Sequence, residues 1–149
     1  GVMFFERLLP VARERLVTIA SDAALIEAAH LLYKGADLLV VCGPAGLLTG
    51  VVTKTDIVGQ MSRRREANNA VAVSLAMTRD VVVCRPDELL PDVWERMKKR
   101  KIKNIPVVDK DYRPVGVLHA RDILQILLEE SQDEESILRD YVMGVGYAN

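Results

Sequence analysis

The chain contains the same short pattern twice. The first copy spans residues 50–57 (GVVTKTDI) and the second spans residues 116–123 (GVLHARDI). The glycine, the aspartate and the following isoleucine recur 66 residues apart (50 to 116). Each copy begins with apolar, β-branched residues and ends in polar ones, a pattern that predicts a strand leading into a helix. Because the self-similarity extends over a whole supersecondary unit, it predicts a duplicated fold.

The hydrophobic pattern around each copy predicts the same order of elements: strand, helix, strand, strand, helix. The first half is expected to hold a strand at 16–19, a helix capped by Ser21-Asp22 and ended by Gly35, strands at 38–42 and 47–52, and a helix after Thr53. The second half is expected to hold a strand at 81–84, a helix opened by Pro86-Asp87, strands at 104–108 and 115–118, and a helix at 120–130.

The remaining segments connect or flank these two units. We divide the chain into an entry arm (1–15), a first repeat (16–66), a linker with a short helix (67–77), a second repeat (78–130) and an acidic docking tail (131–149). Pro10 is expected to interrupt the helical spacing of the entry arm. A short helical turn is expected at 73–77.

Composition excludes several functional classes. Of 149 residues, 20 are Lys or Arg and 21 are Asp or Glu, so the net charge of −1 provides no general attraction to nucleic acid or to an anionic membrane. The run Arg63-Arg64-Arg65 has no aromatic residues beside it and is interpreted as a solvated helix end. The longest aliphatic stretches fall far short of the roughly 20 residues that span a bilayer. We therefore expect a soluble, cytoplasmic protein.

Metal and catalytic chemistry are also not expected. Cys42 and Cys84 stand alone and the chain has only 2 histidines, so no zinc site is predicted. No pairing of a nucleophile with a base, glycine-rich phosphate loop or metal-ligand set is visible. His119 is better explained as a structural or ligand contact than as a general base. The chain is therefore predicted not to be an enzyme.

The polar end of the first copy suits a ribose-phosphate. A hydroxyl and free backbone N–H groups at a helix N-terminus, here near Thr53 and Thr55, favour a phosphate. The carboxylate of Asp56 accepts hydrogen bonds only, which suits the two hydroxyls of a ribose. The alternative is that Thr53 and Asp56 form an acidic capping box, which needs no ligand.

The duplicated unit with the pattern Gly-x-x-Thr-x-x-Asp resembles a cystathionine β-synthase (CBS) domain pair, or Bateman module, over about residues 10–130. The resemblance implies an α/β (α+β) fold in which two β-α-β-β-α repeats pack sheet to sheet with pseudo-two-fold symmetry. It also implies a regulatory protein that needs no cofactor, binds AMP, ADP, ATP or S-adenosylmethionine in clefts between the repeats, and forms homodimers. An effector protein would read the bound state.

The resemblance further implies which residues form the two clefts. The first cleft would be formed by Thr53, Lys54, Thr55, Asp56, Val82, Lys103, Asn104, Ile105 and Pro106. The second would be formed by Val17, Asp37, Leu38, His119, Arg121 and Asp122. His119 replaces the usual Thr or Ser, and Asp37 places a negative charge where the first cleft has Asn104 beside Lys103, so we expect a ligand mainly in the first cleft. The alternative function is a ligand-free dimerisation or scaffold module.

Overall fold

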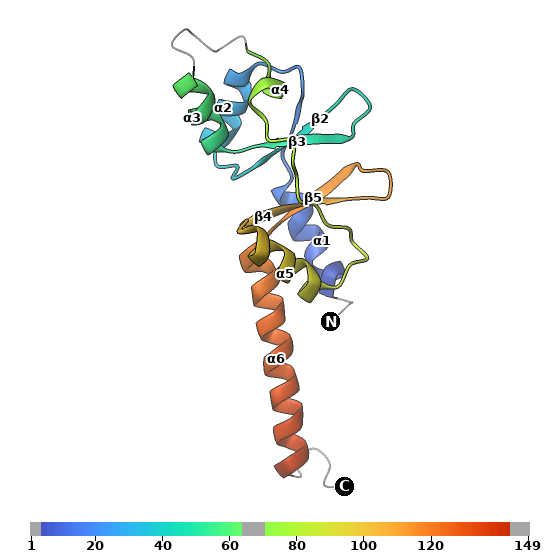
Figure 1. Cartoon of the computed structure of the whole chain (residues 1–149). Helices are drawn as coiled ribbons and strands as arrows, with labels where there is room; N and C mark the ends of the chain where they lie inside the picture. Colours follow the sequence, from blue (N-terminus) through green and yellow to red (C-terminus); the bar gives the residue numbers. More distant parts are fainter. Residues whose placement is uncertain (1–3, 64–70, 144–149) are drawn as a thin grey trace.

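Two small β-sheets, one from each half of the chain, lie at the centre of the molecule (Figure 1). The computed structural model describes residues 4–63 and 71–143. In the first half, β1 (Thr18–Ala20) pairs in parallel with β2 (Leu39–Cys42), which pairs antiparallel with β3 (Leu48–Val52). In the second half, β4 (Asn104–Val108) pairs antiparallel with β5 (Pro114–His119). The two successive strands predicted in the middle of each repeat are therefore present, and they pair antiparallel.

Helices pack beside both sheets. In the described residues they are α1 (Phe4–Arg15), α2 (Leu25–Tyr33), α3 (Lys54–Arg63), α4 (Val73–Ala76), α5 (Leu90–Arg100) and α6 (Ala120–Met143). Figure 1 shows α2, α3 and α4 grouped with the first sheet, and α1 and α5 grouped with the second. None of these helices is both long and apolar enough to cross a membrane.

The two sheets pack against each other through a shared apolar cluster. Its buried members come from both halves: Leu38, Val40, Leu48, Val51, Val108 and Val117. The turns at the strand ends are also joined, because Leu48 N donates to Tyr112 O at 3.1 Å and an Arg113 guanidinium nitrogen donates to Ala45 O at 3.1 Å. The predicted sheet-to-sheet packing of two repeats is confirmed.

Helix α1 runs through Pro10 without interruption, so the predicted break is wrong. Pro10 lacks an N–H and so costs one intrahelical hydrogen bond. The residues on either side compensate by tertiary packing, since Leu8 and Ala12 are buried in the core of the second half. Helix α1 contacts β5 extensively, and this packing decides its conformation.

Two predicted helix starts are also wrong. Helices α2 and α5 begin at Leu25 and Leu90, three or more residues after the expected caps at Ser21-Asp22 and Pro86-Asp87, and neither has a side-chain cap. At α2 the reason is tertiary: Leu25 N donates to Val71 O at 2.7 Å, so a backbone carbonyl from the start of the second half replaces the cap. Gly35 follows α2 with a φ of 123°, as expected of a terminating glycine.

The predicted strand at 81–84 forms only an isolated parallel bridge between Cys84 and Val107. Cys84 N donates to Pro106 O at 3.0 Å and Val108 N donates to Cys84 O at 2.9 Å. Extending this ladder to Val82 would need a hydrogen bond from the backbone nitrogen of residue 106, and proline has no N–H. Residues 81–83 therefore remain without regular structure and border the space between the repeats.

The two cysteines are buried to different degrees. Cys84 is buried, and this burial raises the pKa of its thiol to about 12. Cys42 is only partly buried, and burial raises its pKa as well. Both are held in the protonated, unreactive form at neutral pH.

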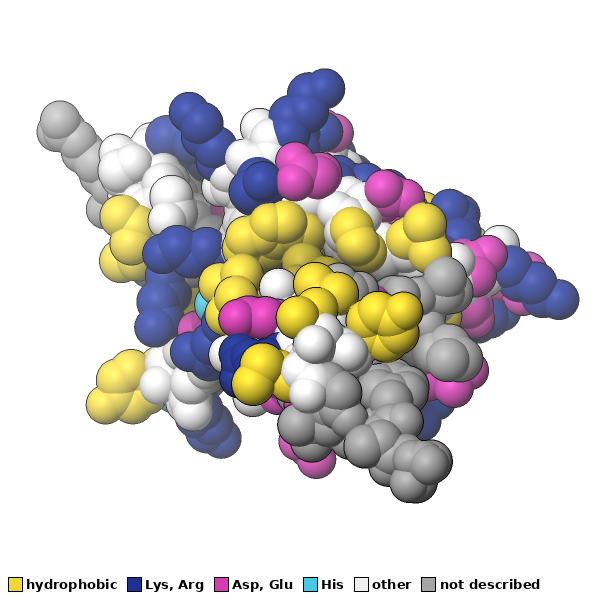
Figure 2. All heavy atoms as spheres, turned by 90° about the horizontal axis from the view of Figure 1, so that it is seen from below, with side chains coloured by type: hydrophobic (Ala, Val, Ile, Leu, Met, Phe, Trp, Pro, Cys, Tyr) yellow, Lys and Arg dark blue, Asp and Glu magenta, His cyan; other side chains and the backbone are white. Residues whose placement is uncertain are grey.

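Helix α6 continues to Met143, so the predicted end at Glu130 is wrong. Residues 131–143 contain no glycine or proline and are rich in good helix formers. Figure 1 shows this part of the helix projecting beyond the rest of the molecule, and Figure 2, viewed from its end, shows apolar side chains gathered on that face. Among the side chains that the structure describes, the exposed large apolar residues of α6 are Leu124, Leu128, Leu138, Tyr141, Val142 and Met143. The predicted short helix at 73–77 is present as α4, while the predicted linker residues 67–70 lie outside the described residues.

Candidate functional site

A cavity of about 510 Å³ lies between the two repeats. One wall is formed by the end of β3 and the start of α3, and the other by the segment before α5, the end of α5 and the start of β4. The lining residues are Leu38, Val51, Thr53, Thr55, Asp56, Thr78, Asp80, Val81, Val82, Arg100, Lys101, Ile102, Lys103, Asn104 and Pro106. The cavity is therefore bounded by residues from both halves of the chain.

Most residues predicted for the first cleft meet at this cavity. Those that line it are Thr53, Thr55, Asp56, Val82, Lys103, Asn104 and Pro106. Lys54 lies instead beside a separate hollow between α2 and α3, near Tyr33 and Val58. Ile105 is fully buried in the core of the second half, because successive residues of a strand point to opposite faces and Asn104 and Pro106 take the cavity side.

Thr53 and Asp56 are hydrogen-bonded to each other at the start of α3. Asp56 Oδ2 accepts from Thr53 N at 2.9 Å and from the Thr53 hydroxyl at 3.2 Å, while Asp56 N lies 3.4 Å from Thr53 Oγ1. These reciprocal contacts form the acidic capping box that was the alternative explanation of the motif. Asp56 Oδ1 accepts from the Thr78 hydroxyl at 2.9 Å. Because Asp56 also lines the cavity, capping and ligand binding are compatible roles for the same carboxylate.

Positive charge predominates at the wall opposite Asp56. Arg100, Lys101 and Lys103 line the cavity there, against the carboxylates of Asp56 and Asp80. An Arg100 guanidinium nitrogen pairs with Asp80 Oδ2 at 3.1 Å, whereas Lys101 and Lys103 have no carboxylate partner among the described residues. A group of this kind attracts an anion such as a phosphate.

Several lining residues were not identified from the sequence. Arg100 and Lys101, at the end of α5, lie beside the cavity because Lys101 adopts a left-handed conformation (φ 55°) that turns the chain directly into residues 102–104. Arg100 and Lys101 stand three and two residues before Lys103, and this short spacing could have indicated that they line the same cavity. Thr78 had no such signal, since it reaches Asp56 through an antiparallel bridge with Val51.

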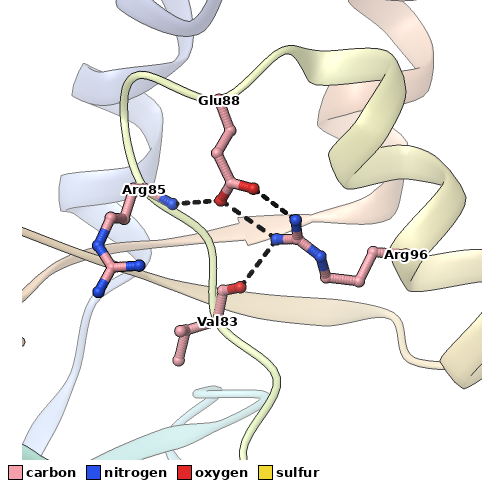
Figure 3. A network of polar contacts seen from close by, with 4 residues as sticks. All are labelled: Val83, Arg85, Glu88 and Arg96. Carbon is pink, nitrogen blue, oxygen red and sulfur yellow. Dashed lines mark hydrogen bonds and ion pairs between the residues drawn. The ribbon is translucent and has the colours of Figure 1, made fainter.

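The wall that contains Val81 and Val82 is held by a polar network (Figure 3). The Arg96 guanidinium on α5 makes a two-pronged contact with the Glu88 carboxylate and donates to Val83 O at 3.0 Å. Glu88 Oε2 also accepts from Arg85 N at 2.8 Å. The hydrogen bond from Arg96 is the main cause that lowers the pKa of the Glu88 carboxyl. The network therefore anchors the irregular segment 81–88 to α5.

A second cavity, of about 390 Å³, lies on the other side of the shared core. Of the residues predicted for the second cleft, Val17, Asp37 and Leu38 line it, together with Arg15 and other residues. His119, Arg121 and Asp122 are not among its lining residues. Leu38 and Asn104, which are 66 residues apart, line both cavities and so mark the centre of the duplicated arrangement.

Asp122 has a different partner from its counterpart Asp56. Its carboxylate pairs with the Arg15 guanidinium, at 2.8 Å between Nε and Oδ2 and 3.0 Å between Nη2 and Oδ1. His119 N donates to Asp122 Oδ2 at 3.2 Å, and Arg121 N donates to His119 Nδ1 at 3.0 Å. Burial, followed by the charges of Arg121 and Arg15, lowers the pKa of His119, so the imidazole is neutral at neutral pH. The aspartate of the second motif is thus held in an ion pair by Arg15 of α1.

Comparison with known families finds the CBS domain at residues 10–63 and again at residues 71–129. Among solved structures, the chain is similar to the CBS domain pair of protein MJ0100 in complex with 5′-methylthioadenosine and S-adenosyl-L-methionine. The identity is 27% and the TM-score 0.68, covering 83% of this chain and 96% of that one. It is also similar to the CBS-domain protein ATU1752 from Agrobacterium tumefaciens, at 26% identity and a TM-score of 0.69, covering 82% and 96% of the two chains.

Among curated proteins, the chain is 30% identical over 117 residues to a homoserine O-acetyltransferase of Methanohalobium evestigatum. The match covers 78% of this chain and 23% of the relative, so the chain spans about a quarter of that protein's length.

Proposed function

Because this chain belongs to the CBS domain family and folds as a CBS domain pair, we propose that it is a regulatory module that binds an adenosine-containing ligand. The observation that carries the proposal is the 510 Å³ cavity, where Thr53 and Asp56 of one repeat face Lys103 and Asn104 of the other. The adenosine derivatives in the CBS pair of protein MJ0100 support the same ligand class.

Each part of such a ligand has a chemically suitable partner in this cavity. Asp56 accepts hydrogen bonds from the two ribose hydroxyls, one of which takes the place of the Thr78 hydroxyl. The start of α3, at Thr53 and Thr55, and the ammonium groups of Lys101 and Lys103 attract phosphate oxygens. Apolar residues of the walls, such as those at 81–82 and 106, contact the adenine ring. The phosphates of AMP, ADP and ATP suit the positively charged wall. The ribose of S-adenosylmethionine suits Asp56.

Regulation follows from the position of the cavity. A ligand that contacts both repeats stabilises the relative arrangement that it binds best, by the difference between its affinities for the alternatives. The proposal includes no catalytic step, because a ligand that shifts the relative arrangement of the two repeats regulates by binding alone. An effector protein would bind differently to the two arrangements of the repeats and so respond to the ligand.

The proposal includes a homodimer. Helices α2 and α3 expose apolar side chains at Ile26, Tyr33, Val58 and Met61. Part of this surface surrounds the hollow of about 270 Å³ between α2 and α3, and an apolar surface of this kind is stabilised by association.

Isothermal titration tests the proposal. We expect the wild-type protein to bind at least one of AMP, ADP, ATP, S-adenosylmethionine and 5′-methylthioadenosine. The Asp56→Asn variant is expected to bind that ligand at least tenfold more weakly, because a hydrogen bond to a charged group contributes about 1.5–3 kcal/mol. Asp92→Asn, which removes an exposed carboxylate of α5 outside the cavity, is the matched control and should bind normally.

Two results would contradict ligand binding in this cavity: no heat with any of the five compounds, or equal affinity of wild type and Asp56→Asn. The alternative, a ligand-free scaffold module, is favoured by one observation, namely that both carboxylate oxygens of Asp56 already have partners within the chain. In that case Asp56→Ala lowers the melting temperature and no compound raises that of the wild type.

A further inference from the structure

The two motif aspartates are equivalent in sequence but not in their surroundings. Asp56 lines its cavity, and its Oδ1 accepts a hydrogen bond from the neutral hydroxyl of Thr78. Asp122 does not line the second cavity, and both of its oxygens contact the Arg15 guanidinium. The difference comes from α1, the segment that precedes the first repeat.

Arg15 is held in place by the packing of α1. It is the last residue of that helix, three residues after Ala12, which is fully buried against Gly116 of β5. The Arg15 side chain lines the second cavity while its guanidinium reaches Asp122. The side chains are only 27% and 13% exposed, so water screens this pair less than it screens a surface pair.

The Arg15 guanidinium occupies the carboxylate oxygens of Asp122 that the hydroxyls of a ribose would need as acceptors. Arg15 Nη2 donates a charge-assisted hydrogen bond to Asp122 Oδ1 at 3.0 Å, while the buried Arg15 Nε lies 2.8 Å from Oδ2 as an ion pair. A hydrogen bond from a charged donor is stronger than one from a hydroxyl. A ribose can displace the Thr78 hydroxyl from Asp56 by a similar hydroxyl. At Asp122 it would have to separate a partly buried ion pair and leave the guanidinium without its partner.

We propose that Arg15 is a specificity-determining residue that closes the second cavity to ribose-containing ligands, so that each chain binds one ligand. Arg15 acts through Asp122 and is therefore a positioning residue. The inference rests on the proposed function, because it assumes that the aspartate of the motif receives the ribose.

The test is the number of ligands bound per chain, measured by isothermal titration with 5′-methylthioadenosine. This probe has no net charge, which suits a cavity that contains Asp37 and Glu14. We expect one site in the wild type and a second site in Arg15→Ala. Arg15→Gln keeps the aliphatic stem and gives the same test if the alanine variant does not fold. Adding Asp122→Asn to either variant should return the number to one.

Arg7→Ala is the matched control, because Arg7 also links α1 to α6, through an exposed pair with Glu129 at 3.3 Å. It should leave one site. Two sites in the wild type, with one lost in Asp122→Asn, would overturn the inference while leaving the proposed function intact. A single site in both Arg15 variants would overturn it as well. If the wild type binds none of the five compounds, the proposed function fails, and if Arg15→Gln also binds none, so does this inference.

Discussion

Replacement of Gly116 by valine is expected to lower the free energy of unfolding by about 3 kcal/mol, the upper part of the usual range for overpacking. A Cβ at residue 116 would lie 2.6 Å from Ala12 Cβ and 2.9 Å from the Ala12 carbonyl carbon. The atoms in the way include backbone of α1, so a side-chain rotation cannot relieve the contact and the whole helix must move from β5. The measurement is urea unfolding followed by circular dichroism.

Gly59→Ala is the control that separates this clash from a general effect of replacing glycine. Gly59 lies within α3, and a Cβ there would be 3.6 Å from the nearest neighbouring side-chain atom, Nη1 of the flexible Arg63 guanidinium. Because alanine favours the helix over glycine by roughly 0.8–1 kcal/mol, Gly59→Ala should stabilise the protein. A Gly116→Val variant as stable as the wild type would mean that α1 does not pack on β5 as described.

Gly50 and Gly116 show why the repeat predicted the fold so well. A Cβ at either position would come within 3.0 Å of a neighbour, Met77 and Thr78 for Gly50 and Ala12 for Gly116. The recurring glycine therefore marks a place in each repeat where a neighbouring segment packs too closely to leave room for a side chain. Short runs of aliphatic and β-branched residues likewise predicted the strands, because this preference is local in sequence.

The errors arose where contacts distant in sequence override local preference. The start of α2 depends on Val71, and Pro10 is accommodated because Ala12 packs on β5. Lys54 and Ile105, which the resemblance places in the first cleft, do not line the cavity, because the side on which a side chain points depends on helix and strand geometry. Arg15 is 107 residues from Asp122, and no pattern in the sequence connects them.

Arg96→Met is expected to destabilise the protein by about 2 kcal/mol and to weaken ligand binding. The substitution removes hydrogen bonds to the Glu88 carboxylate and to Val83 O, and leaves these acceptors without their main partner; bonds of this kind contribute about 1.5–3 kcal/mol. The Arg96 and Glu88 side chains are only 33% and 28% exposed. Because the network holds segment 81–88 against α5, Val81 and Val82 should lose their fixed position in the cavity wall (Figure 3).

The control is Arg139→Met, which breaks an exposed pair with Glu135 on α6 whose side chains are 66% and 71% exposed. Such pairs contribute roughly 0–1 kcal/mol, so stability should change little and ligand affinity not at all. Equal effects of the two variants on unfolding would contradict an anchoring role for Arg96.

The pH dependence of unfolding gives an independent measurement of the same contact. The pKa of Glu88 is lowered in the folded protein from its ordinary value of 4.5, chiefly by the hydrogen bond from Arg96. The folded state therefore favours the ionised carboxylate, and the resulting stabilisation is complete above pH 4.5 and is lost as the pH falls through the lowered folded-state pKa. The stability difference between wild type and Arg96→Met should be constant from about pH 6 to pH 8 and should shrink below about pH 4, as Glu88 becomes protonated in both proteins. A difference that stays constant down to pH 3 would mean that Arg96 stabilises the wall through Val83 O and packing alone.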